Sequence, residues 1–321
     1  MKIGFIGLGN VGGKLAGSLQ RNGFDLTVRD LDRSVAEPFL AKRAVWADSP
    51  KTLAEATDLV ITCLPSPAAS SEVMEATDGV IAGLGPGKMW LEMSTTDEAE
   101  VRRLGAVVEG VGAMPMDGPV SGGCHRAATG NISIFVGGER AAFEKALPAL
   151  KVMGRRILHV GPLGSASILK VVTNYLCSVH LVALGEAMMV AKQAGMDLNT
   201  AFEAIRISSG NSFVHETESQ VILNGSYNIN FTMDLVVKDM SLFDGLAKRL
   251  HVPLELSPIV LDIFKDGQAR YGARAWSPMI VKRLEDACGS DLRAAGFPEE
   301  IVDDEPEEPG AEVVVAGGTK G

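Results

Sequence analysis

Apolar and polar positions divide the chain into two parts with different periodicities. Through about residue 160, short and nearly continuous apolar runs alternate with segments of helical spacing. Such runs are typical of parallel strands that are buried on both faces. Strands are predicted at residues 2–6, 26–28, 59–64, 89–93, 132–136 and 157–160. The alternation of strand and helix predicts an α/β fold with a doubly wound, mainly parallel sheet.

Beyond residue 160 the pattern changes. Residues 161–164 form a glycine- and proline-containing break, and residues 165–195 then have the spacing of one long helix. Further helices are predicted at residues 199–208, 212–223, 233–250, 258–271 and 279–288, with no strand pattern among them. We therefore expect an all-α C-terminal domain that is joined to the first domain by a long interdomain helix.

The formal net charge of −10 is concentrated at the C-terminal end. Residues 299–321 hold eight acidic residues and one lysine, which leaves 32 acidic and 29 basic residues in the rest of the chain. A nearly neutral body without a basic patch predicts no nucleic-acid partner. The expected division is residues 1–160 for the first domain, 161–295 for the helical domain and 296–321 for an acidic, disordered tail.

Cysteine usage and the apolar stretches bear on the compartment. The four cysteines show neither a disulfide framework nor a zinc-binding spacing; they are Cys63, Cys124, Cys177 and Cys288. Free thiols favour a reducing cytoplasm, and no metal site is expected. The first strand begins at Lys2, which leaves no room for a signal peptide. The apolar stretch 168–191 is interrupted by Lys170, Asn174 and Glu186, so no membrane segment is predicted.

The clearest motif is Gly7-Leu8-Gly9-Asn10-Val11-Gly12, between the first strand and a helix. Gly7 can make the tight turn, Gly9 lets the backbone approach a pyrophosphate, and Gly12 lets the helix pack against the sheet. Asp30 follows the second strand, where a carboxylate can bind a ribose hydroxyl. An ordinary glycine-rich turn is the alternative. Because strand, glycines, helix and acid occur in order, we predict a dinucleotide-binding Rossmann domain.

Three further segments carry candidate chemistry. The turn Ser121-Gly122-Gly123 offers a hydroxyl and backbone N–H groups that suit a carboxylate. Lys170 and Asn174 are four residues apart and share a helix face. A desolvated lysine can have a pKa low enough for proton transfer, although it can also extend to the surface. Phe231 and Lys238 could cover a nicotinamide, or Lys238 could belong to a solvated helix face.

Together these segments resemble the 3-hydroxyisobutyrate dehydrogenase family of β-hydroxyacid dehydrogenases, which is related to 6-phosphogluconate dehydrogenase. The matching segments are residues 7–12, 117–130, 161–174 and 231–239, and the resemblance covers about residues 1–290. It implies NAD-dependent oxidation of a small 3-hydroxy carboxylic acid to its semialdehyde or 3-keto acid, or the reverse reduction. It also implies a homodimer or homotetramer.

The resemblance assigns roles to individual residues. It implies that Lys170 is the general acid/base, that Asn174 acts beside it, and that Ser121, Gly122 and Gly123 bind the substrate carboxylate, with Phe231 in the substrate site. The implied cofactor contacts are residues 7–12, Asp30, Leu31, Leu64, Pro65, Thr95 and Lys238. Lys238, if close to Lys170, would lower the pKa of that lysine by repulsion.

Cofactor choice depends on the end of the second strand. Family members that prefer NADP resemble one another in an Asn-Arg pair there, whereas this chain has Asp30 and Leu31. Asp30 would repel a 2′-phosphate and Leu31 cannot pair with it, so NAD is predicted. Arg29 and Arg33 leave NADP open as the less favoured cofactor.

The chain departs from the family pattern after the Ser-Gly-Gly turn. His125 and Arg126 stand where small residues are usual. One hypothesis is that they face solvent or brace the loop. The other is that one of them binds an extra polar or anionic group on the substrate, in which case Arg126 belongs to the substrate site. Thr173 replaces the first asparagine of a common pair. Two alternatives remain: an imine reductase-like enzyme, whose relatives tend to lack the lysine, and a non-catalytic NAD-binding scaffold.

Overall fold

The computed structural model describes residues 1–315, and residues 316–321 of the expected tail lie outside the described residues. The chain forms two units. The first unit comprises Met1–Lys170 and the C-terminal segment from Asp303 onward, and the second unit comprises Val171–Val302. The first boundary thus falls inside the long helix, ten residues later than the sequence suggested. The start of that helix is hydrogen-bonded to Asp117 at the end of a strand of the first unit.

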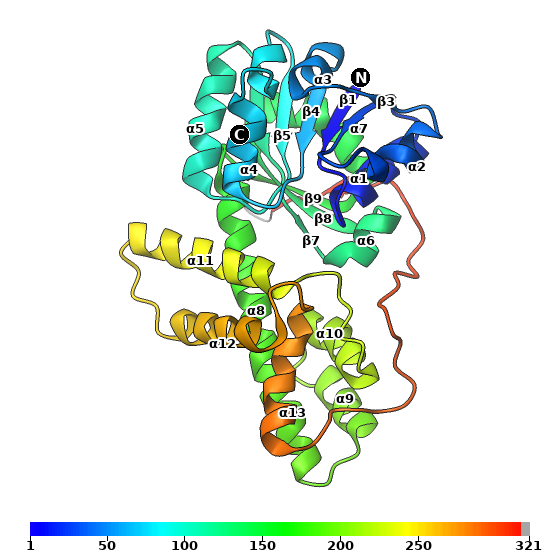
Figure 1. The fold of residues 1–321 in the computed structure, drawn as a ribbon, viewed down its shortest axis with the longest axis vertical. Coiled ribbons are helices and arrows are strands. Elements are labelled where there is room, and N and C mark those ends of the chain that lie inside the picture. The colour runs from blue at the N-terminus through cyan, green and yellow to red at the C-terminus, as the bar shows by residue number, and fades with distance from the viewer. Residues whose placement is uncertain (316–321) are drawn as a thin grey trace. The chain divides into compact units, whose positions relative to one another are not determined.

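The first unit is built on one sheet with the strand order β10-β9-β8-β6-β5-β4-β1-β2-β3, with β7 paired to β8 (Figure 1). All pairings are parallel except those that β8 makes with β6 and β7. This confirms the predicted doubly wound, mainly parallel sheet. The strands are β1 Ile3–Ile6, β2 Leu26–Arg29, β3 Val45–Trp46, β4 Leu59–Thr62, β5 Met89–Glu92, β6 Met114–Asp117, β7 Val120–Ser121, β8 Ile132–Gly138, β9 Gly154–Gly161 and β10 Ala311–Glu312.

Helices cover the sheet, and several of them were not predicted from the sequence. The elements are α1 Gly12–Arg21, η1 Arg33–Ala36, α2 Glu37–Leu40, α3 Pro50–Ala56, α4 Pro67–Glu75, η2 Val80–Gly83, α5 Glu98–Gly110, α6 Gly123–Thr129 and α7 Arg140–Met153. Strand β6 and helix α7 contain Pro115 and Pro148, residues that usually argue against regular structure. Strands β3 and β7 have two residues each, too few to show a periodicity.

The strand side chains explain why the apolar runs are continuous. Val60 of β4 pairs with Trp90 of β5, and Ile61 pairs with Leu91. Because successive residues of a strand point to opposite faces, Val60 and Trp90 enter one hydrophobic core while Ile61 and Leu91 enter the other. All four side chains are fully buried. The site-bearing loops therefore start from a sheet with a core on each face.

The second unit is helical, as predicted. It contains most of α8 Ser165–Gln193, followed by α9 Leu198–Arg206, α10 Phe213–Asn224, α11 Met233–Arg249, α12 Leu256–Tyr271, η3 Ser277–Val281 and α13 Lys282–Cys288. By length and composition alone, α8 could cross a membrane, with a mean hydropathy of 1.5 over 18 residues. The core helix of a globular domain meets the same criterion. Four residues of α8 lie in the hydrophobic core of this unit: Leu181, Leu184, Met188 and Met189.

The C-terminal segment corrects the expectation of a disordered tail. Phe297 packs in the core of the second unit, with its ring 5.0 Å from that of Phe202. Residues 303–315 belong to the first unit and add strand β10 to the edge of the sheet. Composition predicts disorder when a segment has little apolar surface to bury, but this segment is held by backbone pairing and by ion pairs with arginines of the first unit.

Helix α10 buries a carboxyl group beside α8. Glu218 is 7% exposed, its Oε1 lies 3.9 Å from Cys177 Sγ, and its Oε2 has no hydrogen-bond partner within residues 1–315. Burial raises the pKa of Glu218 from 4.5 to about 8. The folded state therefore binds a proton that the unfolded state releases between these pH values, so the free energy of unfolding falls as the pH rises from about 4.5 to about 8.

Glu218→Gln is expected to remove this loss. The variant should match the wild type in urea unfolding at pH 5 and exceed its free energy of unfolding by about 3–4 kcal/mol at pH 8. Glu186→Gln, at an exposed position of α8, serves as the control and should change neither value. Equal unfolding midpoints for Glu218→Gln and the wild type at both pH values would contradict the prediction.

Candidate active site

The glycine loop between β1 and α1 has the geometry of a dinucleotide cradle. Gly7 has a φ of +94°, and a Cβ at Gly12 would lie 2.0 Å from the Gly7 carbonyl oxygen. A Cβ at Gly9 would meet no atom within 4 Å, so the backbone there is open to a ligand. The loop lies between the neighbouring strands β1 and β4, where the strand order reverses. These residues fit the pyrophosphate of NAD.

Asp30 is tied to the same loop. Its Oδ2 accepts a hydrogen bond from the Leu8 amide at 2.6 Å, and its Oδ1 accepts one from the Asp32 amide at 3.2 Å. Each carboxylate oxygen keeps further acceptor capacity, which suits the hydroxyls of a ribose. Leu31 beside it is fully exposed. The structure therefore brings the predicted glycine loop, residues 7–12, and the predicted Asp30 together.

Arg29 and Arg33, the two arginines that could bind the 2′-phosphate of NADP, both make contacts next to β3. The Arg29 guanidinium donates to the carbonyl oxygens of Ala47 and Asp48, at 3.1 and 2.8 Å. The guanidinium of Arg33 lies 5.3 Å from the ring centroid of Trp46. Recruiting either arginine to a 2′-phosphate would break these contacts, which favours NAD.

The loops after β4 and β5 carry Leu64, Pro65 and Thr95. The Leu64 amide donates to Ser94 Oγ at 2.7 Å, and the Ser94 amide donates to Glu92 Oε1 at 2.8 Å. Glu92 is 1% exposed, and burial raises the pKa of its carboxyl group. These bonds join two neighbouring strand ends at the ligand-binding edge of the sheet. Sequence reasoning did not find these two residues: Ser94 acts on Leu64, thirty residues away, and the burial of Glu92 arises only in the folded sheet.

The turn at Ser121–Gly123 precedes α6. Gly122 and Gly123 have φ values of +127° and +87°, which are conformations that favour glycine. A Cβ at Gly123 would lie 2.6 Å from His125 Cε1, so the imidazole stands directly against this backbone. Burial, with a smaller contribution from the Arg126 charge, lowers the pKa of His125. Arg126 Nη2 lies 3.5 Å from Glu305 Oε1 of the C-terminal segment.

Lys170 lies in the first unit, in the second turn of α8, and is only 9% exposed. The start of α8 is fixed by the fully buried Asp117 at the end of β6. Asp117 accepts hydrogen bonds from the Gly164 amide at 2.9 Å, from the Ser167 amide at 2.7 Å and from Ser167 Oγ at 2.8 Å. Desolvation raises the pKa of Asp117, and these bonds oppose that shift. This anchor was not predicted; an aspartate that ends a strand is the only local signal for it.

Asn174 follows Lys170 by one helical turn and lies in the second unit. Its Nδ2 donates to Asp239 Oδ2 at 2.6 Å, and Lys238 Nζ lies 2.9 Å from Asp239 Oδ1. The buried Asp239 thus joins two predicted residues. Phe231 packs, half-buried, against the core of this unit. Asp239 was absent from the predicted site, although it is adjacent to Lys238.

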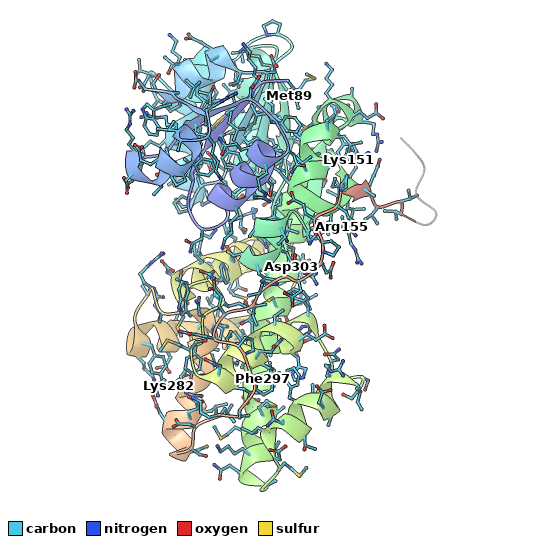
Figure 2. The ribbon with its side chains drawn as sticks, turned by 90° about the vertical axis from the view of Figure 1, so that its right-hand side faces the viewer. Met89, Lys151, Arg155, Lys282, Phe297 and Asp303 are labelled. Carbon is cyan, nitrogen blue, oxygen red and sulfur yellow. The ribbon has the colours of Figure 1, made fainter. Side chains whose placement is uncertain are left out.

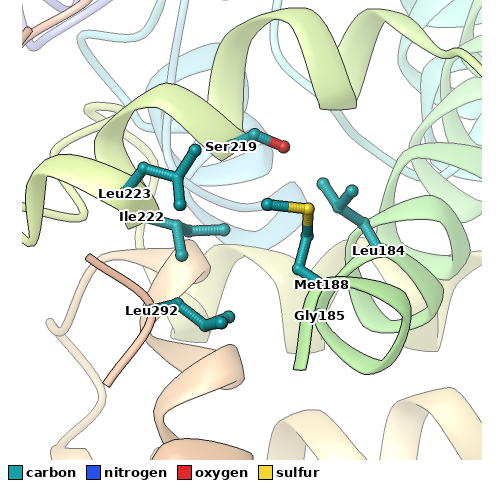
Figure 3. Close-up of a pocket in the computed structure, with 7 residues that line it drawn as sticks. All are labelled: Leu184, Gly185, Met188, Ser219, Ile222, Leu223 and Leu292. Carbon is teal, nitrogen blue, oxygen red and sulfur yellow. The ribbon is translucent and has the colours of Figure 1, made fainter. Parts of the chain in front are cut away.

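Neither a metal cluster nor the pocket of the second unit offers an alternative active site within residues 1–315. No group of three His, Cys, Asp or Glu side chains that could hold a metal occurs within residues 1–315. A pocket in the second unit is shown in Figure 3, and Ser219 contributes the one hydroxyl to its lining. It is lined by Leu184, Gly185, Met188, Ser219, Ile222, Leu223 and Leu292. Because it holds no charged group, it does not suit a hydroxy acid.

Two family models together match most of the chain. Residues 2–161 match the NAD binding domain of 6-phosphogluconate dehydrogenase. Residues 164–284 match the family described as NAD-binding of NADP-dependent 3-hydroxyisobutyrate dehydrogenase. The two matches meet at the end of β9, and the C-terminal segment lies beyond both.

Similar proteins cover nearly the same region. The 2-(hydroxymethyl)glutarate dehydrogenase of Eubacterium barkeri is 32% identical over 90% of this chain and 96% of its own length. The mitochondrial 3-hydroxyisobutyrate dehydrogenase of Rattus norvegicus is 32% identical over 82% of this chain and 81% of its own. The structure titled Mycobacterium tuberculosis 3-hydroxyisobutyrate dehydrogenase with L-serine has a TM-score of 0.80 and 26% identity, covering 88% of this chain and 98% of that one. This chain therefore belongs to the 3-hydroxyisobutyrate dehydrogenase family and is an NAD-binding oxidoreductase that acts on a CH–OH group.

Proposed function

We propose that the chain oxidises a small 3-hydroxy carboxylic acid, or carries out the reverse reduction, with Lys170 as the general acid/base. The observation that carries this proposal is the burial of Lys170 on a helix whose start is tied by Asp117 to β6. Strand β6 is followed, after Gly118, Pro119 and the short strand β7, by the turn at Ser121–Gly123. The proton-transfer group and the carboxylate-binding turn are therefore both attached to the end of one strand in the first unit.

Each residue has a distinct task in the proposed mechanism. The Ser121 hydroxyl and the amides of Gly122 and Gly123 hold the substrate carboxylate. Lys170 accepts the proton of the 3-hydroxyl during oxidation and returns a proton to the oxygen during reduction. Asn174, itself oriented by Asp239, binds the substrate beside Lys170. The glycine loop and Asp30 would hold the cofactor, which would take up the hydride as NAD⁺ in the oxidation and supply it as NADH in the reduction.

The remaining cofactor contacts are proposed from the same family resemblance. Leu64, Pro65 and Thr95 follow the strand ends beside the glycine loop, and their loops are joined through Ser94. Lys238 keeps its proposed role while its ammonium group pairs with Asp239. The presence of Lys170 argues against the imine reductase-like and scaffold alternatives.

A panel of hydroxy acids tests the proposal. With NAD⁺, we expect NADH absorbance to appear with at least one of 3-hydroxyisobutyrate, L-serine and 2-(hydroxymethyl)glutarate, compounds that occur in the names or titles of the similar proteins. The matched acids that lack the 3-hydroxyl group should give none. If every hydroxy acid leaves NAD⁺ unreduced, the scaffold alternative replaces this proposal.

We also propose that the chain forms a homo-oligomer through its helical unit. Apolar side chains of α8 within this unit stay exposed on the single chain, among them Leu176 at 46% and Val190 at 69%. Large exposed apolar side chains on one helix are typical of an interface. Light scattering at micromolar concentration should give the mass of a dimer or tetramer, and the mass of one chain would contradict this. The cytoplasmic location stays a proposal from the sequence, in which the cysteines show no disulfide framework.

A further inference from the structure

The C-terminal segment forms a strap on the first unit, and we use this name for residues 303–312. Figure 2 shows the chain running from Asp303 past Arg155 and Lys151 to the short strand β10. The Gly310 amide donates to the Lys151 carbonyl oxygen at 2.7 Å. A Cβ at Gly310 would lie 1.8 Å from the Gly154 carbonyl oxygen, so this position has room only for glycine. The strap lies beyond residue 284, where the second family match ends.

Acidic side chains of the strap pair with basic side chains of the first unit. The pairs are Glu307 with Arg21 at 3.3 Å, Glu308 with Arg155 at 2.6 Å and Glu312 with Arg140 at 2.5 Å. Exposed pairs of this kind contribute little one at a time. Here they act together with the pairing of β10 to β9, which fixes the register of the strap.

The first residues of the strap hold the end of α6. Asn131 is 5% exposed, and its Nδ2 donates to Asp303 Oδ2 at 2.8 Å and to the Glu305 carbonyl oxygen at 3.0 Å. Thr129 Oγ1 also donates to Asp303. Arg126, in the middle of α6, pairs with the Glu305 carboxylate. Helix α6 is only seven residues long and begins at Gly123, so a contact at its end constrains the turn that precedes it.

We propose that Asp303 and Glu305 are positioning residues for the substrate carboxylate, acting through α6 on the turn at Ser121–Gly123. This inference rests on the proposed function of that turn. It assigns Arg126 to the strap, which favours the bracing role over direct reading of the substrate. On this proposal, Arg126 of α6 and the strap act together to hold the turn at Ser121–Gly123 in place.

Asp303→Asn is expected to raise the KM for the hydroxy acid about tenfold, because the hydrogen bonds from Thr129 and Asn131 then end on a neutral amide oxygen instead of a carboxylate and are weaker. The KM for NAD⁺ and kcat should stay unchanged. Glu305→Gln, at a more exposed pair, should raise the KM for the hydroxy acid about twofold. Asp304→Asn is the matched control, since this exposed neighbour removes the same charge. A KM in Asp303→Asn equal to that of Asp304→Asn would overturn the proposal.

Arg126→Ala separates the two interpretations of that arginine. If Arg126 binds the strap, KM rises by the same factor for 3-hydroxyisobutyrate and for 2-(hydroxymethyl)glutarate. A rise confined to the acid with the second carboxylate would show that Arg126 reads the substrate and would overturn its assignment to the strap.

Hydrogen exchange of the full-length protein tests the strap without any turnover. In Asp303→Asn, amides of residues 121–131 should exchange about tenfold faster than in the wild type and in Asp304→Asn, while those of β1 and β4 stay unchanged. Unchanged exchange at residues 121–131 would overturn the proposal. Faster exchange there, in a protein that oxidises no acid of the panel, would refute the proposed function and leave the contact of the strap with α6 established.

Discussion

Lys170→Ala is expected to lower kcat by about 10²- to 10⁴-fold, the usual contribution of a general acid/base. The affinity for NAD⁺ should stay within about twofold of the wild type, because the glycine loop and Asp30 form their contacts on other elements. The measurements are kcat on the best acid of the panel and the fluorescence of bound NADH.

Two further measurements distinguish loss of the proton-transfer group from a structural change in Lys170→Ala. Lys248→Ala, at an exposed position of α11, removes the same side chain from a helix and should leave kcat unchanged. Added methylamine should restore part of the activity of Lys170→Ala, since a free amine can replace the missing proton carrier. Full turnover in Lys170→Ala without any amine would refute the assignment of this lysine.

The double variant Asp30→Asn, Leu31→Arg is expected to shift the ratio of kcat/KM for NADP over NAD upward by about 10²- to 10³-fold. Repulsion of a 2′-phosphate is removed and a charged hydrogen bond is gained, each worth about one power of ten or more. Asparagine keeps an oxygen that can accept the hydrogen bond from the Leu8 amide, so the glycine loop should retain its shape.

Leu31→Ala alone is the control, and it should not change the cofactor ratio because Leu31 is fully exposed and carries no polar group. An NADP preference in the wild type would contradict the prediction at once. An unchanged ratio in the double variant would show that the ribose is bound elsewhere.

The sequence predicted those parts of the fold whose signals are local. The apolar run of β4 is continuous because both of its faces are buried, and this pattern is visible in the residues themselves. Strand β6 and helix α7 gave no such signal, since a proline interrupts each pattern. The sheet accepts Pro115 opposite Trp90, and such tolerance depends on packing that the local pattern does not contain.

The candidate site divides in the same way. Residues 7–12, the pair Lys170 and Asn174, and the Ser121–Gly123 turn were predicted because each is a short segment with its own chemistry. The residues that hold these segments in place were not predicted. Asp117 holds Ser167 fifty residues away, and Asp239 holds Asn174 sixty-five residues away.

What the sequence by itself determined is the kind of fold and the dinucleotide loop, because these follow from periodicity and spacing within short stretches. It also indicated the family, through the resemblance of four short segments that occur in order. Only the tertiary structure decided where the acidic end of the chain lies. Its composition predicts disorder, but Asp303 meets the hydroxyl of Thr129 across 174 residues of sequence. Whether a charge stays in solvent or finds a partner depends on which surfaces folding brings together, and that information is spread over the whole chain.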